Sequence, residues 1–275
     1  MLVLNLDPAF APIEGTGISF KNFTFYGGEP HIKIDPGFDT TRPVTITHRL
    51  NSFNRLGEVC VAVDALRRMG VKEINLFIPY FPGARQDRIM IPGEPLTVKV
   101  YADIINAMGF AEVTVFDPHS EVAPALLNNC KIVPNYGFIE EVLKKIGTDV
   151  KLISPDGGAL KKIYKLSEYL GGAAVVECSK SRDVKTGRLS GFKVYEDALA
   201  GADCLIVDDI CDGGGTFAGL AEELKRKNAG RLYLAVSHGI FSKGFDMFGD
   251  FEALYTTDSF GDLDNDKVQQ VKIKL

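Results

Sequence analysis

The stretch IVDDICDGGGTFAGLAEEL, residues 206–224, holds three aspartates and three consecutive glycines directly after an apolar run. Buried carboxylates are costly unless a positive or hydrogen-bonding group meets them. Consecutive glycines give up side-chain packing and cost folding entropy. Backbone amides that small glycines leave open at a helix N-terminus bind anions. We therefore predict a strand at CLIV (204–207), a helix beginning near Phe217, and a ligand-binding loop, DDICDGGGT, between them.

Phosphate is the expected ligand of this loop. The glycines at 213–215 would offer amides, and the hydroxyl of Thr216 could cap the helix or bind the anion. Asp208 and Asp209 would repel phosphate, so they should face sugar hydroxyls or a divalent cation. A phosphorylated sugar satisfies both halves of the loop.

Two other phosphate motifs do not fit the chain. A P-loop requires Gly-Lys before Ser or Thr, and the sequence holds no Gly-Lys dipeptide. Gly213, Gly215 and Ala218 match the dinucleotide pattern G-x-G-x-x-G/A, but SHG stands where the pattern requires an acidic residue at the end of the next strand. A tight glycine turn with solvated aspartates remains the simplest alternative.

The rest of the chain alternates short β-rich runs with amphipathic stretches, which indicates an α/β fold of parallel sheets with helices on both faces. The first residues, MLVLNLDPAF, are expected to contain a strand rather than a signal peptide. Helices are expected where apolar residues recur at helical spacing and a glycine follows, at 56–66, 160–170 and 217–224. The other predicted strands are 44–47, 74–80, 113–116, 151–154, 173–177 and 232–236.

Turn residues in NNCKIVPNYG, 128–137, suggest a boundary between two lobes of similar size. We expect an N-terminal lobe at 1–134, joined by a last strand at 266–275, and a C-terminal lobe at 135–265. In open α/β sheets, ligands bind beyond the carboxyl ends of the strands. The candidate site is therefore expected there.

Composition narrows the class of partner. The formal net charge of −5 offers no broad attraction to nucleic acid or to anionic membranes. No apolar stretch approaches the length of a membrane span. The five cysteines have no metal-ligand spacing and are expected to be buried reduced thiols of a cytoplasmic protein, with Cys211 a packing residue.

Several motifs resemble those of the ribose-phosphate diphosphokinases, also called phosphoribosyl-diphosphate (PRPP) synthetases. VDDICDGGGT resembles the PRPP loop that this family shares with the type I phosphoribosyltransferases, whereas ARQDR and the DPH motif are absent from plain phosphoribosyltransferases. The resemblance covers nearly the whole chain and is closest to the short archaeal-type members. The further matching stretches are VDALRRMG (63–70), IPYFPGARQDR (78–88), PGEPLTVKVYADII (92–105), FDPHSE (116–121) and SPDGGALKK (154–162).

The resemblance implies two type I phosphoribosyltransferase-like lobes and a defined reaction. Mg²⁺-ATP would give its β,γ-diphosphate to the 1-hydroxyl of ribose 5-phosphate, and AMP would leave. Such transfer depends on alignment, metal and positive charge more than on covalent chemistry. By resemblance, His119 and Asp156 are the protein ligands of the catalytic Mg²⁺, and Lys180 and Arg182 are the catalytic cations of a mobile loop. No general base is assigned.

The remaining site residues are carried over in the same way. By resemblance, the ATP-binding residues are Phe25, Glu29, Arg85, Gln86, Asp87 and His119, and the ribose-phosphate loop comprises Asp208, Asp209, Asp212, Gly213, Gly214, Gly215 and Thr216. Family members are dimers or hexamers in which Phe25 and Glu29 would reach a neighbour's adenine site. A homo-oligomer is therefore expected.

Two positions depart from the family pattern. FYGGE has Gly27 where the Phe-x-Asp-x-Glu segment has an acid, and DGGGT has Gly213 where a threonine is common. The lost threonine removes a hydroxyl from the phosphate cradle and opens space beside it. ADP-ribose is therefore a second possible acceptor, which would connect the protein to NAD metabolism. Two further hypotheses stay open: a non-catalytic regulatory homologue and a phosphoribosyltransferase.

Overall fold

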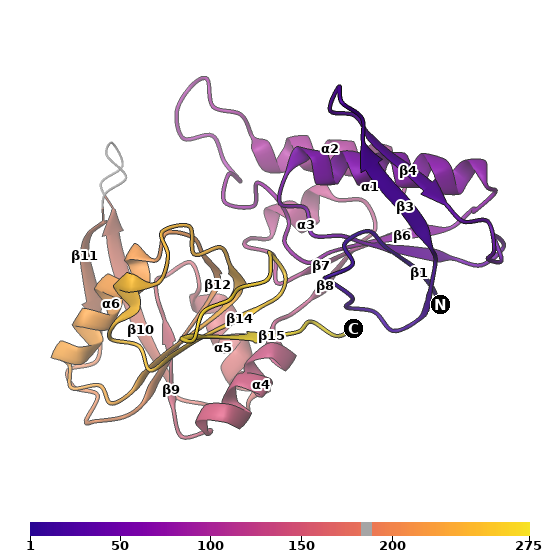
Figure 1. Cartoon of the computed structure of the whole chain (residues 1–275). Coiled ribbons are helices and arrows are strands. Elements are labelled where there is room, and N and C mark those ends of the chain that lie inside the picture. The colour runs from indigo at the N-terminus through magenta and orange to yellow at the C-terminus, as the bar shows by residue number, and fades with distance from the viewer. Residues whose placement is uncertain (183–188) are drawn as a thin grey trace. The chain divides into compact units, whose positions relative to one another are not determined.

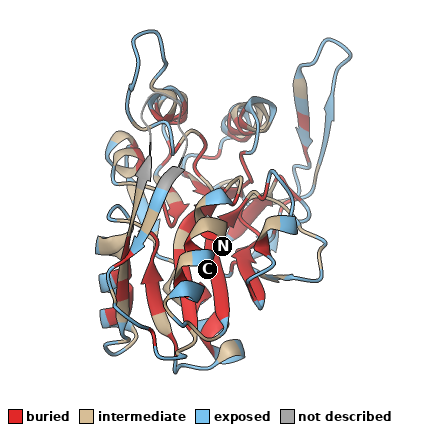
Figure 2. Cartoon of the chain, turned by 90° about the vertical axis from the view of Figure 1, so that its left-hand side faces the viewer, coloured by how far each residue is buried: buried red, intermediate tan, exposed pale blue. Residues whose placement is uncertain are grey.

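The computed structural model describes residues 1–182 and 189–275, with side chains for all of these except 181, 182, 189 and 190 (Figure 1). The chain divides into two compact units, Met1–Pro134 with Lys272–Leu275, and Asn135–Val271. Each has its own buried apolar core. Figure 2 shows the buried residues concentrated in the strands. The α/β class expected from the sequence is confirmed, because both units contain mainly parallel sheets flanked by helices.

The first unit is built on a six-stranded sheet in the order β2-β1-β5-β6-β7-β8, with every neighbouring pair parallel. Its strands are β1 (Leu2–Asn5), β2 (Thr16–Gly17), β5 (Val44–Thr47), β6 (Ile74–Ile78), β7 (Glu112–Phe116) and β8 (Cys130–Val133). Its helices are α1 (Phe53–Arg68), α2 (Thr97–Ala107) and α3 (Val122–Leu126). An antiparallel hairpin, β3 (Phe20–Thr24) and β4 (Pro30–Ile34), lies against α1.

The second unit contains a seven-stranded sheet in the order β11-β10-β9-β12-β13-β14-β15. Its strands are β9 (Lys151–Ser154), β10 (Val175–Arg182), β11 (Leu189–Val194), β12 (Cys204–Cys211), β13 (Leu232–Gly239), β14 (Ala253–Thr257) and β15 (Val268–Val271). Only the β10–β11 pair is antiparallel among its described pairs. The helices are α4 (Tyr136–Ile146), α5 (Leu160–Tyr169), α6 (Gly215–Arg226) and the 3-10 turn η1 (Asp246–Phe248).

Local sequence explains why these elements form. In α1 the predicted apolar residues Leu56, Val59, Val63 and Leu66 are buried, as 3.6-residue periodicity requires of a core-facing stripe. Ser52 caps its N-terminus by accepting the N–H of Arg55. Strands β13 and β14 are buried throughout, and β12 is buried except at Asp208. Each begins as an apolar run, which is typical of a parallel sheet covered on both faces.

Two expectations about strands are wrong. β12 continues to Cys211, because it pairs with β13 as far as Cys211 and Gly239. Asp208 and Asp209 therefore lie in the strand rather than in a loop. The expected last strand at 266–275 does not join the N-terminal lobe as a whole, because Val268–Val271 pair in parallel with β14 in the second sheet. Only Lys272–Leu275 belong to the first unit, where the N–H of Leu275 donates to the carbonyl of Pro12.

The cysteines of the second unit, Cys178, Cys204 and Cys211, are buried as expected, whereas Cys60 and Cys130 are partly exposed. Burial raises the pKa of Cys178 to about 12. Cys211 packs in the core of the second unit. Among the described helices, none has the length and apolar character needed to cross a membrane.

Candidate active site

The loop that follows β12 is shorter than expected and is followed at once by α6. Asp212, Gly213 and Gly214 connect the strand to the helix, and α6 begins at Gly215 rather than near Phe217. Gly214 is the N-cap residue, with φ +77°, and no described side chain caps the helix. Thr216 lies in the first turn and does not act as the cap. The first amides of a helix lack partners within it, so this turn keeps donors available for an anion.

Gly214 is required by both conformation and packing. Its positive φ is rarely adopted by L side chains. A Cβ there would stand 2.5 Å from Cζ of Phe248 and 2.6 Å from Sδ of Met247, closer than real contacts allow. Gly215, in contrast, faces open space. Side chains of η1 therefore pack against the turn at Gly214, whereas Gly215, the first residue of α6, has open space beside it.

The two aspartates of β12 have different environments. Asp209 is buried, and its Oδ2 lies 3.2 Å from Nζ of Lys162 on α5. Asp208 keeps partial exposure, and its Oδ1 accepts the N–H of Asp209. Two causes raise the pKa of Asp208 to about 8: desolvation by burial, which is the larger, and repulsion from Asp209. Without a cation or a ligand hydroxyl, the pair does not hold two full negative charges at neutral pH.

Asp156 lies two residues after the end of β9, at the carboxyl edge of the same sheet. Its Oδ1 accepts the N–H groups of Gly158 and Ala159 at 2.8 and 3.1 Å, and its Oδ2 lies 2.5 Å from Nζ of Lys180. Burial would raise the pKa of Asp156, but the hydrogen bonds and charge of Lys180 and the two amides lower it below its ordinary value. Asp156 is therefore ionised at neutral pH.

Lys180 lies in strand β10 rather than in a loop. It is opposite Phe192 in the antiparallel β10–β11 pair. The pairing continues to Arg182, whose side chain lies outside the described part of the structure. The hairpin thus brings Lys180 to Asp156, a contact between residues 24 positions apart in sequence that no local pattern predicts.

In the first unit, the ARQDR and DPHSE stretches meet. Asp87 is hydrogen-bonded to Arg88 at 2.9 Å, and it is close enough to Ser120 and His119 for both to affect it electrostatically. The hydrogen bond of Arg88, partly opposed by desolvation, lowers the pKa of Asp87. His119 is in the segment after β7, as expected. Arg85 and Gln86 are exposed beside Asp87, on the segment that follows β6.

Phe25 and Glu29 form the turn of the β3–β4 hairpin. The N–H of Phe25 donates to the carbonyl of Glu29. The ring of Phe25 is half-exposed and contacts Phe23 and His31 in an aromatic cluster. The hairpin therefore presents an aromatic surface in the first unit.

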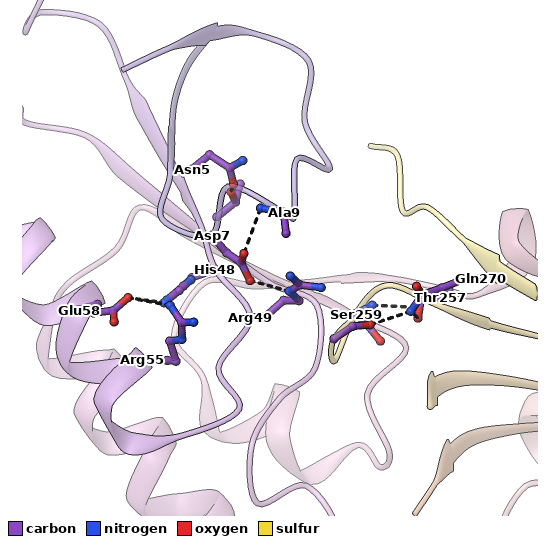
Figure 3. A network of polar contacts seen from close by, with 12 residues as sticks. Asn5, Asp7, Ala9, His48, Arg49, Arg55, Glu58, Thr257, Ser259 and Gln270 are labelled. Atoms are coloured by element: carbon purple, nitrogen blue, oxygen red, sulfur yellow. Dashed lines mark hydrogen bonds and ion pairs between the residues drawn. The ribbon is translucent and has the colours of Figure 1, made fainter. Parts of the chain in front are cut away.

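A buried polar network lies at the carboxyl ends of β1 and β5 in the first sheet (Figure 3). Asp7 accepts a hydrogen bond from Nε of Arg49 at 2.6 Å and from the N–H of Ala9 at 3.2 Å. The Nε2 atom of fully buried His48 lies 3.0 Å from Oε2 of Glu58. These polar residues, which follow β1 and β5 or lie in α1, were not identified from the sequence, because no local motif marks them.

The donor chemistry of the second unit is compatible with Mg²⁺. Within the described residues, no three His, Cys, Asp or Glu side chains are grouped to hold a metal. Mg²⁺ usually keeps several waters and takes only one or two carboxylates from protein. The ionised carboxylate of Asp156 meets that requirement. His119 and Asp156 belong to different units, and each is placed only within its own unit.

The second unit thus places, at the carboxyl edge of a parallel sheet, a helix N-terminus without a side-chain cap, a carboxylate pair and a carboxylate–lysine pair. Residues 22–109 match the family model for the N-terminal domain of ribose phosphate pyrophosphokinase. The ribose-phosphate pyrophosphokinase of Mycoplasmopsis pulmonis is 30% identical over 226 residues, which cover 81% of this chain and 69% of that protein. A putative ribose-phosphate pyrophosphokinase of Enterococcus faecalis is 30% identical over 70% of this chain, and the match spans 59% of that protein.

The fold agrees with this relationship. A crystal structure of phosphoribosylpyrophosphate synthetase from Mycobacterium smegmatis aligns with a TM-score of 0.79 and 22% identity, over 93% of this chain and 86% of that one. The chain belongs to the ribose-phosphate pyrophosphokinase family, whose members are diphosphotransferase enzymes.

Proposed function

We propose that the protein transfers diphosphate from Mg²⁺-ATP to the 1-hydroxyl of ribose 5-phosphate, giving PRPP and AMP. Family membership supports the reaction class. The observation that carries the assignment of the acceptor site is the grouping, at one sheet edge, of an uncapped helix N-terminus with the Asp208–Asp209 pair. Amides suit the 5-phosphate, and carboxylates suit the ribose hydroxyls.

The residues of the second unit have separate tasks in this proposal. The amides at 213–216 hold the phosphoryl end of the acceptor. Asp208 and Asp209 accept hydrogen bonds from its ribose hydroxyls, and Lys162 orients Asp209. Lys180 neutralises charge that develops on the transferred diphosphate, as fixed cations do in phosphoryl transfer. Mg²⁺, when bound, supplies charge neutralisation and alignment of the phosphate oxygens.

In the first unit, Arg85, Gln86, Asp87 and His119 are proposed to bind ATP. Arg85 is exposed and can bind a phosphate through two parallel N–H groups. His119 and Asp156 are proposed to hold Mg²⁺. Phe25 and Glu29 are proposed to reach the adenine site of a second copy, because the hairpin turn presents them to solvent in the isolated chain.

ADP-ribose is the second candidate acceptor. The observation that favours it is glycine at position 213, where a side chain would otherwise help define the phosphate cradle. ADP-ribose has a free 1-hydroxyl on its terminal ribose, and its 5-position continues as a diphosphate. The transfer chemistry would be the same, with AMP leaving and the diphosphate added to the terminal ribose.

A substrate panel tests both proposals. AMP release should be measured with ribose 5-phosphate and with ADP-ribose separately, and each product identified by mass spectrometry. AMP release with ribose 5-phosphate supports the first proposal, and release with ADP-ribose alone would replace it with the second. No AMP with either compound would point to a non-catalytic homologue.

Substitution of Lys180 in the same assay tests its role. We expect Lys180→Ala to lower kcat by about 100-fold or more, because a positioned charge that acts in the transition state is typically worth that much. Acceptor affinity, measured by calorimetry, should change little. Lys165→Ala, which removes an exposed lysine of α5, is the matched control. A normal kcat with weakened acceptor binding would contradict the catalytic role.

A further inference from the structure

The segment after β13 is hydrogen-bonded to the end of β12 and to the first residue of the turn that precedes α6. The N–H groups of Ile240 and Phe241 donate to the carbonyl of Cys211. The N–H of Ser242 donates to the carbonyl of Asp212 at 3.0 Å, and its hydroxyl donates to Oδ1 of Asp212 at 2.6 Å. Segment 240–242 is therefore held in register with the start of the loop, and the residue that follows it is held beside Gly213.

That residue is Lys243. A turn closes over it, with the N–H of Gly244 donating to the carbonyl of Phe241. The Cδ and Cε atoms of Lys243 lie 3.4 Å from where a Cβ on Gly213 would stand. The aliphatic stem of Lys243 thus borders the space beside Gly213 at ordinary van der Waals distance. The ammonium group is one bond beyond Cε, and Gly213 lies two residues before the start of α6.

The other lysines named at this sheet edge have ion-pair partners, whereas Lys243 has none among the described residues. Lys162 and Lys180 are paired with Asp209 and Asp156, respectively. Within the described residues, Lys243 forms no ion pair, and its side chain is exposed. An exposed lysine beside the turn that precedes a helix places a mobile positive charge near the end of the helix that favours anions.

We infer that Lys243 is a specificity-determining residue of the acceptor site, whose ammonium group binds an oxygen of the acceptor's 5-phosphoryl group. This inference rests on the proposed function. Lys243 replaces the hydroxyl that a threonine at 213 would supply with a charge-assisted hydrogen bond. A longer, charged donor reaches further from the loop, so it also serves an acceptor whose 5-position carries a diphosphate.

The test measures binding apart from turnover. Calorimetric dissociation constants for ribose 5-phosphate and ADP-ribose, without ATP, should rise about tenfold in Lys243→Ala, the loss expected for one partly exposed charge-assisted contact. Lys243→Arg should retain most of the affinity. Lys267→Ala, another exposed lysine of the same unit, should have no effect. The KM for the acceptor should follow the dissociation constant, with the KM for ATP unchanged.

An exchange of side chains sharpens the test. Position 213 does not have a positive φ, so threonine fits there once the lysine stem is gone. Gly213→Thr should recover part of the acceptor affinity lost in Lys243→Ala. Unchanged acceptor binding and KM in Lys243→Ala would overturn the inference even if AMP is produced. A tenfold loss of binding by a protein that releases no AMP would support the inference and overturn the proposed function. If the wild type binds neither acceptor, both are wrong.

Discussion

At the residue scale, both departures from the family pattern are compensated by neighbouring side chains. The sequence indicated a lost acid at Gly27. In the structure, Oε2 and Oε1 of Glu29 lie 2.5 and 2.8 Å from where a Cβ at 27 would stand. The stem of Lys243 lies at ordinary contact distance, 3.4 Å, from where a Cβ at 213 would stand. A polar or charged side chain of another residue therefore lies beside each glycine.

Gly214 should be intolerant of substitution, and Gly215 provides the matched control. Gly214→Ala forces an L side chain into positive φ and places its methyl group against Phe248 and Met247. We expect a loss of about 1–3 kcal/mol in the free energy of unfolding, measured by urea denaturation. Gly215→Ala, with open space around it and a helical backbone, should be neutral or slightly stabilising. Equal effects of the two substitutions would contradict this explanation.

At the element scale, α6 is coupled to the hairpin that carries Lys180. Gly219 on α6 lies under the ring of Phe192 on β11, so closely that a Cβ at 219 would overlap Cε2 of that ring. Phe192 is in turn opposite Lys180 across the β10–β11 pair. Phe192, on the strand paired with that of Lys180, therefore packs against α6.

This contact predicts that a Gly→Ala substitution at position 219 changes stability in the direction opposite to the usual one. In a helix interior, Gly→Ala ordinarily stabilises by about 1 kcal/mol. Gly219→Ala should instead destabilise by about 1–2 kcal/mol, because the ring of Phe192 must move. In a Phe192→Ala background, the same substitution should stabilise. A double-mutant cycle of unfolding free energies measures the coupling. Stabilisation by Gly219→Ala in the wild-type background would show that the ring moves without cost.

At the scale of the whole molecule, stability in acid should depend on buried ion pairs. The side chains of Asp7 and Arg49 are only 12% and 7% exposed. Burial would raise the pKa of Asp7, but the hydrogen bond and charge of Arg49 lower it below the ordinary 3.8. A carboxylate with a lowered pKa stabilises the folded state above its unfolded pKa. That contribution is lost as pH falls through the folded pKa.

Asp7→Asn should therefore destabilise the protein in a pH-dependent way. We expect a loss of about 1–3 kcal/mol in unfolding free energy near neutral pH, shrinking as pH falls below about 3.8. Thermal unfolding followed by circular dichroism across this range measures the difference. Asp64→Asn, which removes an exposed ion pair with Arg68 on α1, should cost less than about 0.5 kcal/mol. A pH-independent loss in Asp7→Asn would assign the effect to packing alone.

Local pattern was enough to predict much of the fold. Hydrophobic periodicity located α1, α5 and α6, and β-rich runs located the central strands, because helices and buried strands must present apolar residues at fixed spacing. Ends of elements were harder to predict. β12 extends through Asp208 and Asp209 because β13 pairs with it and Lys162 meets one carboxylate, and neither fact is local.

The sequence by itself determined the α/β class, the family and the residue types of the site, because these depend on periodicity and on motifs of contiguous residues. Only the tertiary structure decided which charges meet. Lys180 reaches Asp156, Lys162 reaches Asp209, and Lys243 lies over Gly213. These partners come from different strands, helices and turns of the second unit. Parallel pairing brings their carboxyl ends to one edge, and no stretch of sequence records that proximity.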